Sequence, residues 1–192
     1  MVVDKIIFGL IVFFALLSYA VGIKQMLGGT YKPSVFTRVI WIFLAINSLF
    51  GVVLSHSTTS SIVLASAMLA GNVAFCGVSL FKGDKRFGLV EYVSIALLII
   101  SGLVWVLFDS PLINLSISLV AHFIGGIPTY VRVLRKPTDE SPWFWILFFI
   151  ASLLSIIISW GSPISLLIFP IYYTIFDGSM FGLSLRGRKG GA

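Results

Sequence analysis

An acidic residue lies inside the last long apolar stretch of the chain, where a charged group is costly. Asp177 is about a dozen residues into that stretch and nine residues before Arg186, so we expect it deep inside a helix that crosses a membrane. An ionisable residue at such a depth faces a cavity or a partner, and indicates a functional site. Tyr173 precedes it by one helical turn, on the same helix face. Asp177 is therefore a candidate for binding a cationic or hydroxyl-rich solute, or for carrying a coupling proton.

Other polar residues of the apolar stretches could take part in the same chemistry. His122 lies about halfway along another stretch, where an imidazole either relays protons or serves as a neutral packing donor. Pro170 removes one backbone hydrogen bond and can kink the helix beside Asp177. The alternative for Asp177 is structural: hydrogen bonds with Asn72 or Tyr173 would lock the helices together.

The residue types exclude several kinds of site. No set of His, Cys, Asp and Glu residues has the spacing of metal ligands, and no glycine-rich loop has the form that binds phosphate. Cys76 is the single cysteine of the sequence, so it has no disulfide partner within the chain. The Lys and Arg residues lie in short loops between apolar stretches, a pattern that follows from membrane insertion and does not indicate nucleic-acid binding. The sequence therefore predicts no enzyme activity, no cofactor, no metal site and no nucleic-acid partner.

The elements that position these residues are apolar stretches long enough to cross a lipid bilayer. Apolar residues make up 58% of the chain and charged residues only 10%, far below the share of about a quarter in a soluble domain. A spanning helix takes roughly 20 residues. The sequence predicts seven transmembrane helices: Ile6–Ile23, Val39–Ser55, Ser61–Phe81, Gly88–Phe108, Leu112–Val133, Trp143–Trp160 and Ile164–Leu185.

The basic residues lie on one side of this arrangement. They follow the first, third, fifth and seventh stretches, and only Lys5 falls on the other side. The positive-inside rule then places the N-terminus outside a plasma or inner membrane and the C-terminus in the cytoplasm. Tryptophans near the ends of the stretches indicate an interfacial belt in preference to a ligand-stacking role: Trp41, Trp143 and Trp145 on the cytoplasmic side, Trp105 and Trp160 on the outer side.

The chain contains an internal repeat. Matching pairs recur at an offset of 104 residues, and of 105 after a short outer loop: Lys32-Pro33 with Lys136-Pro137, Trp41-Ile42 with Trp145-Ile146, and Asn72 with Asp177. The expected units are a three-helix repeat at residues 1–81, a linker helix at 82–110 and a second repeat at 111–192. Because a triplet plus a linker is an even number of helices, both triplets run in the same direction across the membrane. Parallel repeats of this kind place a solute site between the halves.

Three helices, a linker and three more, with the N-terminus outside, resemble the SWEET, SemiSWEET and PQ-loop transporter clan over essentially the whole chain. The Pro-Gln dipeptide of the PQ-loop family falls at Lys24-Gln25 and Pro128-Thr129, so each repeat keeps one half of it. The resemblance implies hinge prolines near the cytoplasmic helix ends. Pro128 and Pro142 fit that role, whereas their first-repeat counterparts are Lys24 and Arg38.

The resemblance also implies a central pocket with an asparagine from the third helix of each repeat. Asn72 is similar to that residue, and Asp177 takes its place in the second repeat. A further pocket residue from each second helix, sometimes Trp in sugar carriers, corresponds to Gly51 and Ser155. The implied function is a facilitator or proton-coupled carrier for a small polar solute such as a sugar or amino acid, by alternating access. The aspartate favours amino-acid-like or cationic substrates, and a vitamin carrier of the nicotinamide-riboside type stays an alternative.

Two other classes of membrane protein stay open. A non-transporting subunit that binds lipid or a partner protein predicts a dry, packed centre with Asp177 satisfied by protein groups. A seven-helix receptor predicts a ligand site but no route through the cytoplasmic half. A water-accessible cavity that contains Asn72 and Asp177 would favour transport over both, and the sequence leaves a homo-oligomeric assembly open.

Overall fold

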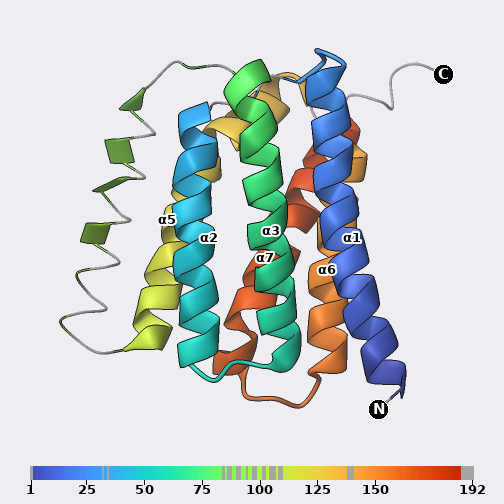
Figure 1. The fold of residues 1–192 in the computed structure, drawn as a ribbon, viewed down its shortest axis with the longest axis vertical. Coiled ribbons are helices and arrows are strands. Elements are labelled where there is room, and N and C mark those ends of the chain that lie inside the picture. Colours follow the sequence, from blue (N-terminus) through green and yellow to red (C-terminus); the bar gives the residue numbers. More distant parts are fainter. Residues whose placement is uncertain are drawn as a thin grey trace.

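Long apolar sequences with few helix breakers form long helices in this chain (Figure 1). The computed structural model describes residues 2–83 except 32 and 34, residues 110–137 and 141–186, and scattered positions between 85 and 107. Within these residues all regular structure is helical, without strands. The helices are α1 (Val2–Leu27), α2 (Val35–Leu54), α3 (Thr59–Lys82), α5 (Pro111–Arg135), α6 (Pro142–Ile158) and α7 (Ile164–Leu185).

Six of the predicted apolar stretches are helical in the structure, with ends that differ by a few residues. Helix α2 begins at Val35, four residues before the predicted start at Val39. It therefore includes Arg38. Helix α6 ends two residues earlier than predicted, at Ile158, because Ser159 leaves the helical conformation and Gly161 adopts a left-handed one with φ +90°. The predicted fourth helix, with the 82–110 linker, lies mostly outside the described residues.

The lengths and composition of the helices indicate a membrane-embedded protein. Among the described residues, α1, α3, α5 and α7 are long and apolar enough to cross a bilayer, and Arg38–Leu54 and Pro142–Ile158 are shorter apolar helical stretches. Large apolar side chains such as Phe13, Phe43 and Phe50 are exposed on the outer surface. Extensive exposed apolar surface of this kind suits contact with lipid.

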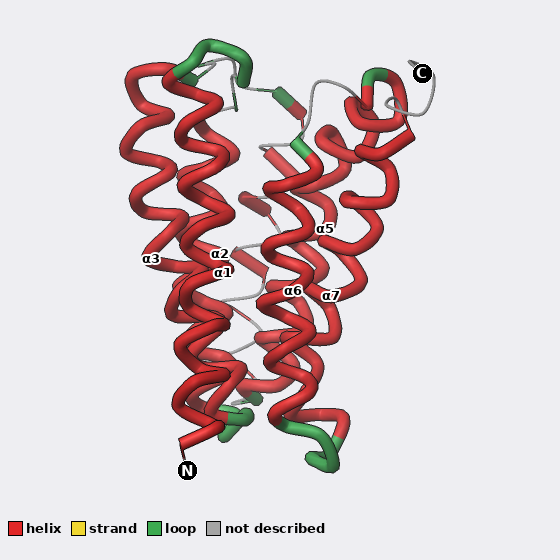
Figure 2. The backbone as a smooth tube through the Cα atoms, turned by 90° about the vertical axis from the view of Figure 1, so that its right-hand side faces the viewer, coloured by secondary structure: helices red, strands yellow, loops and turns green. Residues whose placement is uncertain are grey.

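The six helices bounded above contact one another in a closed ring, which we describe as a first group, α1 to α3, and a second group, α5 to α7. In the first group α3 contacts both α1 and α2, and in the second α7 contacts both α5 and α6. Figure 2 shows these groups side by side. Between them, α1 packs on α6 and α2 packs on α5, while α1 and α5 run in the same direction, as do α2 and α6 (Figure 1). The first helix of each group therefore packs against the second helix of the other group.

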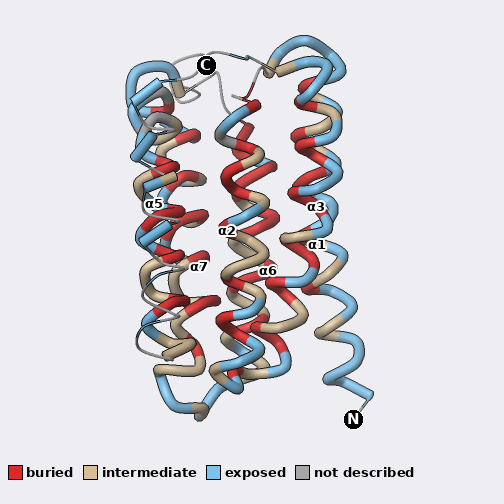
Figure 3. Tube along the Cα trace, turned by 60° about the vertical axis from the view of Figure 1, so that its left-hand side comes forward, coloured by how far each residue is buried: buried red, intermediate tan, exposed pale blue. Residues whose placement is uncertain are grey.

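Buried residues follow the inner faces of these helices, and exposed residues face outward (Figure 3). Two glycines let aromatic rings approach the helix backbones closely. A Cβ added at Gly71 of α3 would lie 1.9 Å from Cδ2 of Tyr19, and one added at Gly22 of α1 would lie 2.5 Å from Cε2 of Phe75. These contacts bring α1 and α3 together and direct the Tyr19 ring towards the centre of the bundle.

Polar side chains join the two groups near the end of the bundle that carries the N-terminus (Figure 1). The Ser60 hydroxyl of α3 donates to the carbonyl oxygen of Ser155 in α6 at 3.0 Å, and lies 2.7 Å from the Ser159 hydroxyl. On the other side of the bundle, Asn114 of α5 donates to Asn47 of α2 at 3.0 Å, and Asn47 donates back at 3.1 Å. Interhelical hydrogen bonds of this kind stabilise helix association in membranes.

Candidate functional site

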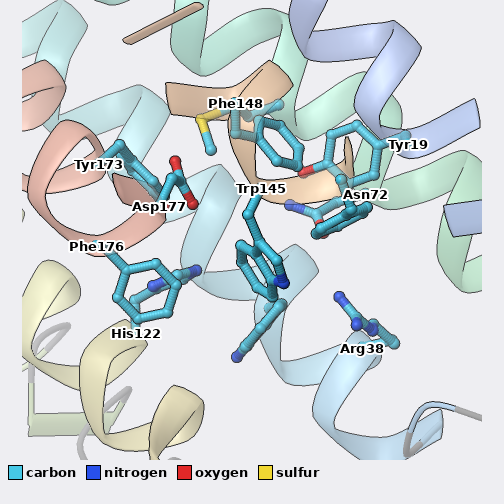
Figure 4. Close-up of a pocket in the computed structure, with 12 residues that line it drawn as sticks. Tyr19, Arg38, Asn72, His122, Trp145, Phe148, Tyr173, Phe176 and Asp177 are labelled. Carbon is cyan, nitrogen blue, oxygen red and sulfur yellow. The ribbon is translucent and has the colours of Figure 1, made fainter. Parts of the chain in front are cut away.

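A small cavity lies between the two groups of helices. The volume that admits the centre of a water molecule is only about 20 Å³. That is room for roughly one water. All six described helices contribute to its wall, and the lining residues are Tyr19, Arg38, Trp41, Met68, Asn72, His122, Phe144, Trp145, Phe148, Tyr173, Phe176 and Asp177 (Figure 4).

Asn72, Tyr173 and Asp177, which the sequence suggested as neighbours, all line this cavity. The third helix of each group supplies one polar residue: Asn72 from α3 and Asp177 from α7. Asp177 is only 2% exposed, and its Oδ2 atom has no hydrogen-bond partner in the described part of the chain. A structural lock requires hydrogen bonds to both carboxyl oxygens, because a buried acceptor without a partner is destabilising. The Oδ2 atom therefore favours a functional role for Asp177.

Arg38 is a cavity residue that the sequence analysis missed, because it was grouped with the basic residues of the loops. It is 5% exposed, and its Nη2 donates to the Tyr31 hydroxyl at 2.7 Å. Its guanidinium carbon lies 4.6 Å from the ring centroid of Trp41 and 4.3 Å from that of Phe75, within cation–π range. The Nε atom is buried and has no described partner. The earlier start of α2 turns Arg38 from a loop residue into a helical residue that faces the cavity.

The expected interfacial position of Trp41 and Trp145 is wrong. Both indole rings are buried and line the cavity, and neither Nε1 has a hydrogen-bond partner among the described residues. Trp143 and Trp160 are 67% and 85% exposed, as a belt residue should be, and Trp105 lies outside the described residues. The match of Trp41 with Trp145 at the repeat offset was the signal that could have identified them, because a lipid-facing belt does not require matched positions.

Gly51 and Ser155 were expected in the pocket, but the structure places them elsewhere. A Cβ added at Gly51 would lie 3.0 Å from Cβ of Leu115, which makes this glycine a packing point between α2 and α5. Ser155 donates to the Ser60 hydroxyl at 2.9 Å. Gly51 is ten residues from Trp41, which corresponds to about 15 Å along a helix. The second-helix residues of the cavity are instead Trp41 and Trp145.

His122 lines the cavity with contacts that suit a packing role. Its ring stacks on Trp41 with centroids 4.8 Å apart, and Nδ1 lies 2.9 Å from the Tyr172 hydroxyl. Within the described chain, no hydrogen bond connects it to Asp177, so a proton relay between the two would need additional groups such as water.

The three hinge candidates occupy different positions in their helices. Pro142 is the first residue of α6, a position that proline occupies without breaking a hydrogen bond. Pro170 lies inside α7, seven residues before Asp177, and Pro128 lies inside α5. Each of these two removes a backbone hydrogen bond within a helix, so α5 and α7 are the helices whose bending would change the cavity.

Comparisons of the chain with protein-family models, with curated proteins and with solved structures gave no match. The residues and their geometry are therefore the basis for interpreting this site.

Proposed function

We propose that this chain is a membrane transporter for a small polar solute, either a facilitator or a proton-coupled carrier. It would consist of two parallel three-helix repeats joined by a linker helix, in the manner of the SWEET and PQ-loop clan. In each described group the third helix contacts both the first and the second helix, and this supports the arrangement. The observation that carries the proposal is the buried Asp177 carboxyl group, which faces a cavity between the groups and whose Oδ2 has no hydrogen-bond partner among the described residues.

The cavity lies between the two groups of helices, where a site for alternating access is expected. It is too small for a sugar or amino acid in this conformation, so the groups must separate for a solute to enter. Hydrogen bonds of Ser60 close the end that carries the N-terminus. At the opposite end, a surface hollow lies beside Lys24 of α1 and Trp143 of α6. Opening would then alternate between breaking the serine contacts and widening this hollow.

Several cavity side chains would each contribute a different contact to the bound solute. The Asn72 amide can donate to and accept from a neutral polar group. Asp177 would bind a cationic or hydroxyl-rich group, or carry the coupling proton. Trp41 and Trp145 offer flat apolar walls with one N–H donor each, and both donors are unpartnered among the described residues.

A second candidate is a non-transporting membrane subunit that binds lipid or a partner protein. The small volume of the cavity favours it, because such a subunit needs only a packed centre. The Oδ2 atom of Asp177 is evidence against it, because a structural carboxyl group should be hydrogen-bonded by the protein and Oδ2 has no partner in the part of the chain that the structure describes.

Uptake into proteoliposomes distinguishes the two candidates. Labelled hexoses, disaccharides, amino acids and nucleosides would be tested with and without an inward proton gradient, for the native chain, Asp177→Asn and the exposed control Asp4→Asn. Gradient-stimulated uptake that is lost only in Asp177→Asn indicates proton-coupled transport. Gradient-independent uptake that survives in Asp177→Asn indicates a facilitator. No uptake of any solute by the native chain favours the non-transporting subunit.

Cysteine labelling tests the proposed orientation. In a Cys76→Ala background, Trp160→Cys introduces a thiol at an exposed loop position and Lys136→Cys one at the opposite end of the bundle. With the N-terminus outside, a membrane-impermeant maleimide should label Trp160→Cys in intact cells and Lys136→Cys only after lysis. The reverse pattern would overturn the orientation.

A further inference from the structure

Among the described residues that line the cavity, Arg38 is basic and Asp177 is acidic, and the two do not form an ion pair with each other. Arg38 lies on α2 of one group and Asp177 on α7 of the other. The described residues form no ion pair with either. Figure 4 shows the two side chains on opposite sides of Trp145. A buried charge without a counterion is strongly disfavoured, so this arrangement needs an explanation.

Arg38 is held as a group that can receive an anion. Its guanidinium carbon lies over the rings of Trp41 and Phe75, and within the described part of the chain its hydrogen bond goes to a neutral hydroxyl, that of Tyr31. The buried Nε–H has no acceptor among the described residues. A guanidinium fixed by aromatic faces keeps N–H donors at its edge, and these donors match the two oxygens of a carboxylate.

Acceptors line other parts of the cavity. Asp177 of α7 offers Oδ2 from the second group, and Asn72 of α3 and Tyr19 of α1, from the same group as Arg38, add an amide and a hydroxyl oxygen to the lining. An ammonium group has three N–H donors and no acceptor, so such a set of oxygens can satisfy it completely.

We propose that this cavity recognises a small zwitterion, with its carboxylate on Arg38 and its ammonium on Asp177. This inference rests on the proposed function and specifies the substrate class. A zwitterion compensates both wall charges and adds no net charge to the membrane interior. A sugar leaves both charges unpaired, a simple cation leaves Arg38 unpaired, and a simple anion leaves Asp177 unpaired. The cavity has room for roughly one water in this conformation, so the zwitterion enters only when the two groups of helices separate.

The test compares ligands on the native protein, so it does not depend on a variant that folds. The melting temperature of the purified protein would be measured with the common L-amino acids and with the ω-amino acids β-alanine and 4-aminobutyrate. For each zwitterion that raises the melting temperature, two derivatives follow: its methyl ester, which keeps only the ammonium, and its N-acetyl form, which keeps only the carboxylate. We expect the zwitterion to bind about tenfold to hundredfold more tightly than either derivative, because each derivative loses a charge-assisted contact.

Variants then assign the two ends of the ligand. Arg38→Gln should weaken the zwitterion about tenfold to hundredfold and leave the methyl ester unchanged, whereas Asp177→Asn should leave the N-acetyl form unchanged. Arg38→Lys, which keeps the charge without the planar group, should fall between native and Arg38→Gln. The exposed Lys136→Gln is the control for net charge and should bind like the native protein.

The outcomes separate this inference from the proposed function. Binding of zwitterions without uptake into proteoliposomes would support the inference and contradict the transporter. Uptake of hexoses or nucleosides with no melting shift by any zwitterion at millimolar concentration would support the transporter and overturn the inference. Equal binding of a zwitterion and either of its derivatives would also overturn it.

Discussion

Replacing Gly71 with alanine should destabilise the bundle by displacing Tyr19 from the cavity wall. The added Cβ would lie 1.9 Å from Cδ2 and 2.3 Å from Cε2 of Tyr19, whereas ordinary contacts begin at 3.4 Å. The ring must therefore move by about 1.5 Å, the difference between 3.4 and 1.9 Å. It has little room to do so, because Tyr19 is buried and packs edge-on against Phe148 with centroids 4.8 Å apart.

The magnitude follows from two opposing effects. Overpacking a buried site costs about 1–3 kcal/mol, and the severe overlap at Gly71 places this substitution near the upper end. Alanine in place of glycine within a helix stabilises it by about 1 kcal/mol. The net loss in the free energy of unfolding is then about 2 kcal/mol, or roughly a 30-fold change in the unfolding equilibrium.

Gly77→Ala in the same helix is a matched control, because a Cβ at Gly77 has nothing within 4 Å. It should be neutral or stabilising by up to about 1 kcal/mol. Equilibrium unfolding in mixed detergent micelles would compare both variants in native and Tyr19→Ala backgrounds. The loss at Gly71 should disappear once Tyr19 is truncated. Equal stability of Gly71→Ala and Gly77→Ala, or the same loss in both backgrounds, would refute the steric argument.

Three further predictions concern individual contacts. Leucine at Asn114 should lower unfolding stability by about 0.6–2 kcal/mol, whereas changing Asn47 and Asn114 together should cost less than the sum of the single changes, as a double-mutant cycle would measure. Trp145→Ala should cost about 3–5 kcal/mol in the same unfolding assay, and Trp143→Ala less than about 0.5 kcal/mol, so similar losses would contradict the cavity position of Trp145. The buried thiol of Cys76 should resist a maleimide in the folded protein and react fully in denaturant, and rapid labelling of the folded protein would contradict the packing around α3.

Part of the site could be predicted because it depends on sequence periodicity. The expected parallel repeats pair Asn72 with Asp177, and equivalent positions in such repeats lie at equivalent depths on either side of the interface between them. Their common cavity thus follows from the repeat without knowledge of side-chain contacts. The cavity position of Arg38 could not be predicted in this way, because its counterpart in the second repeat is Pro142. The sequence also does not show whether an arginine beside an apolar stretch lies in a loop or in the end of a helix.

The sequence by itself determined where the described helices lie, because the transfer of apolar residues from water into lipid depends on local composition and length. Only the tertiary structure decided which side of each helix faces the centre. The rotation of α2 and α6 turns Trp41 and Trp145 into the cavity and leaves Trp143 outside. That rotation depends on close contacts between distant segments, such as Tyr19 against Gly71, which hydropathy cannot reveal because lipid and protein interior are almost equally apolar.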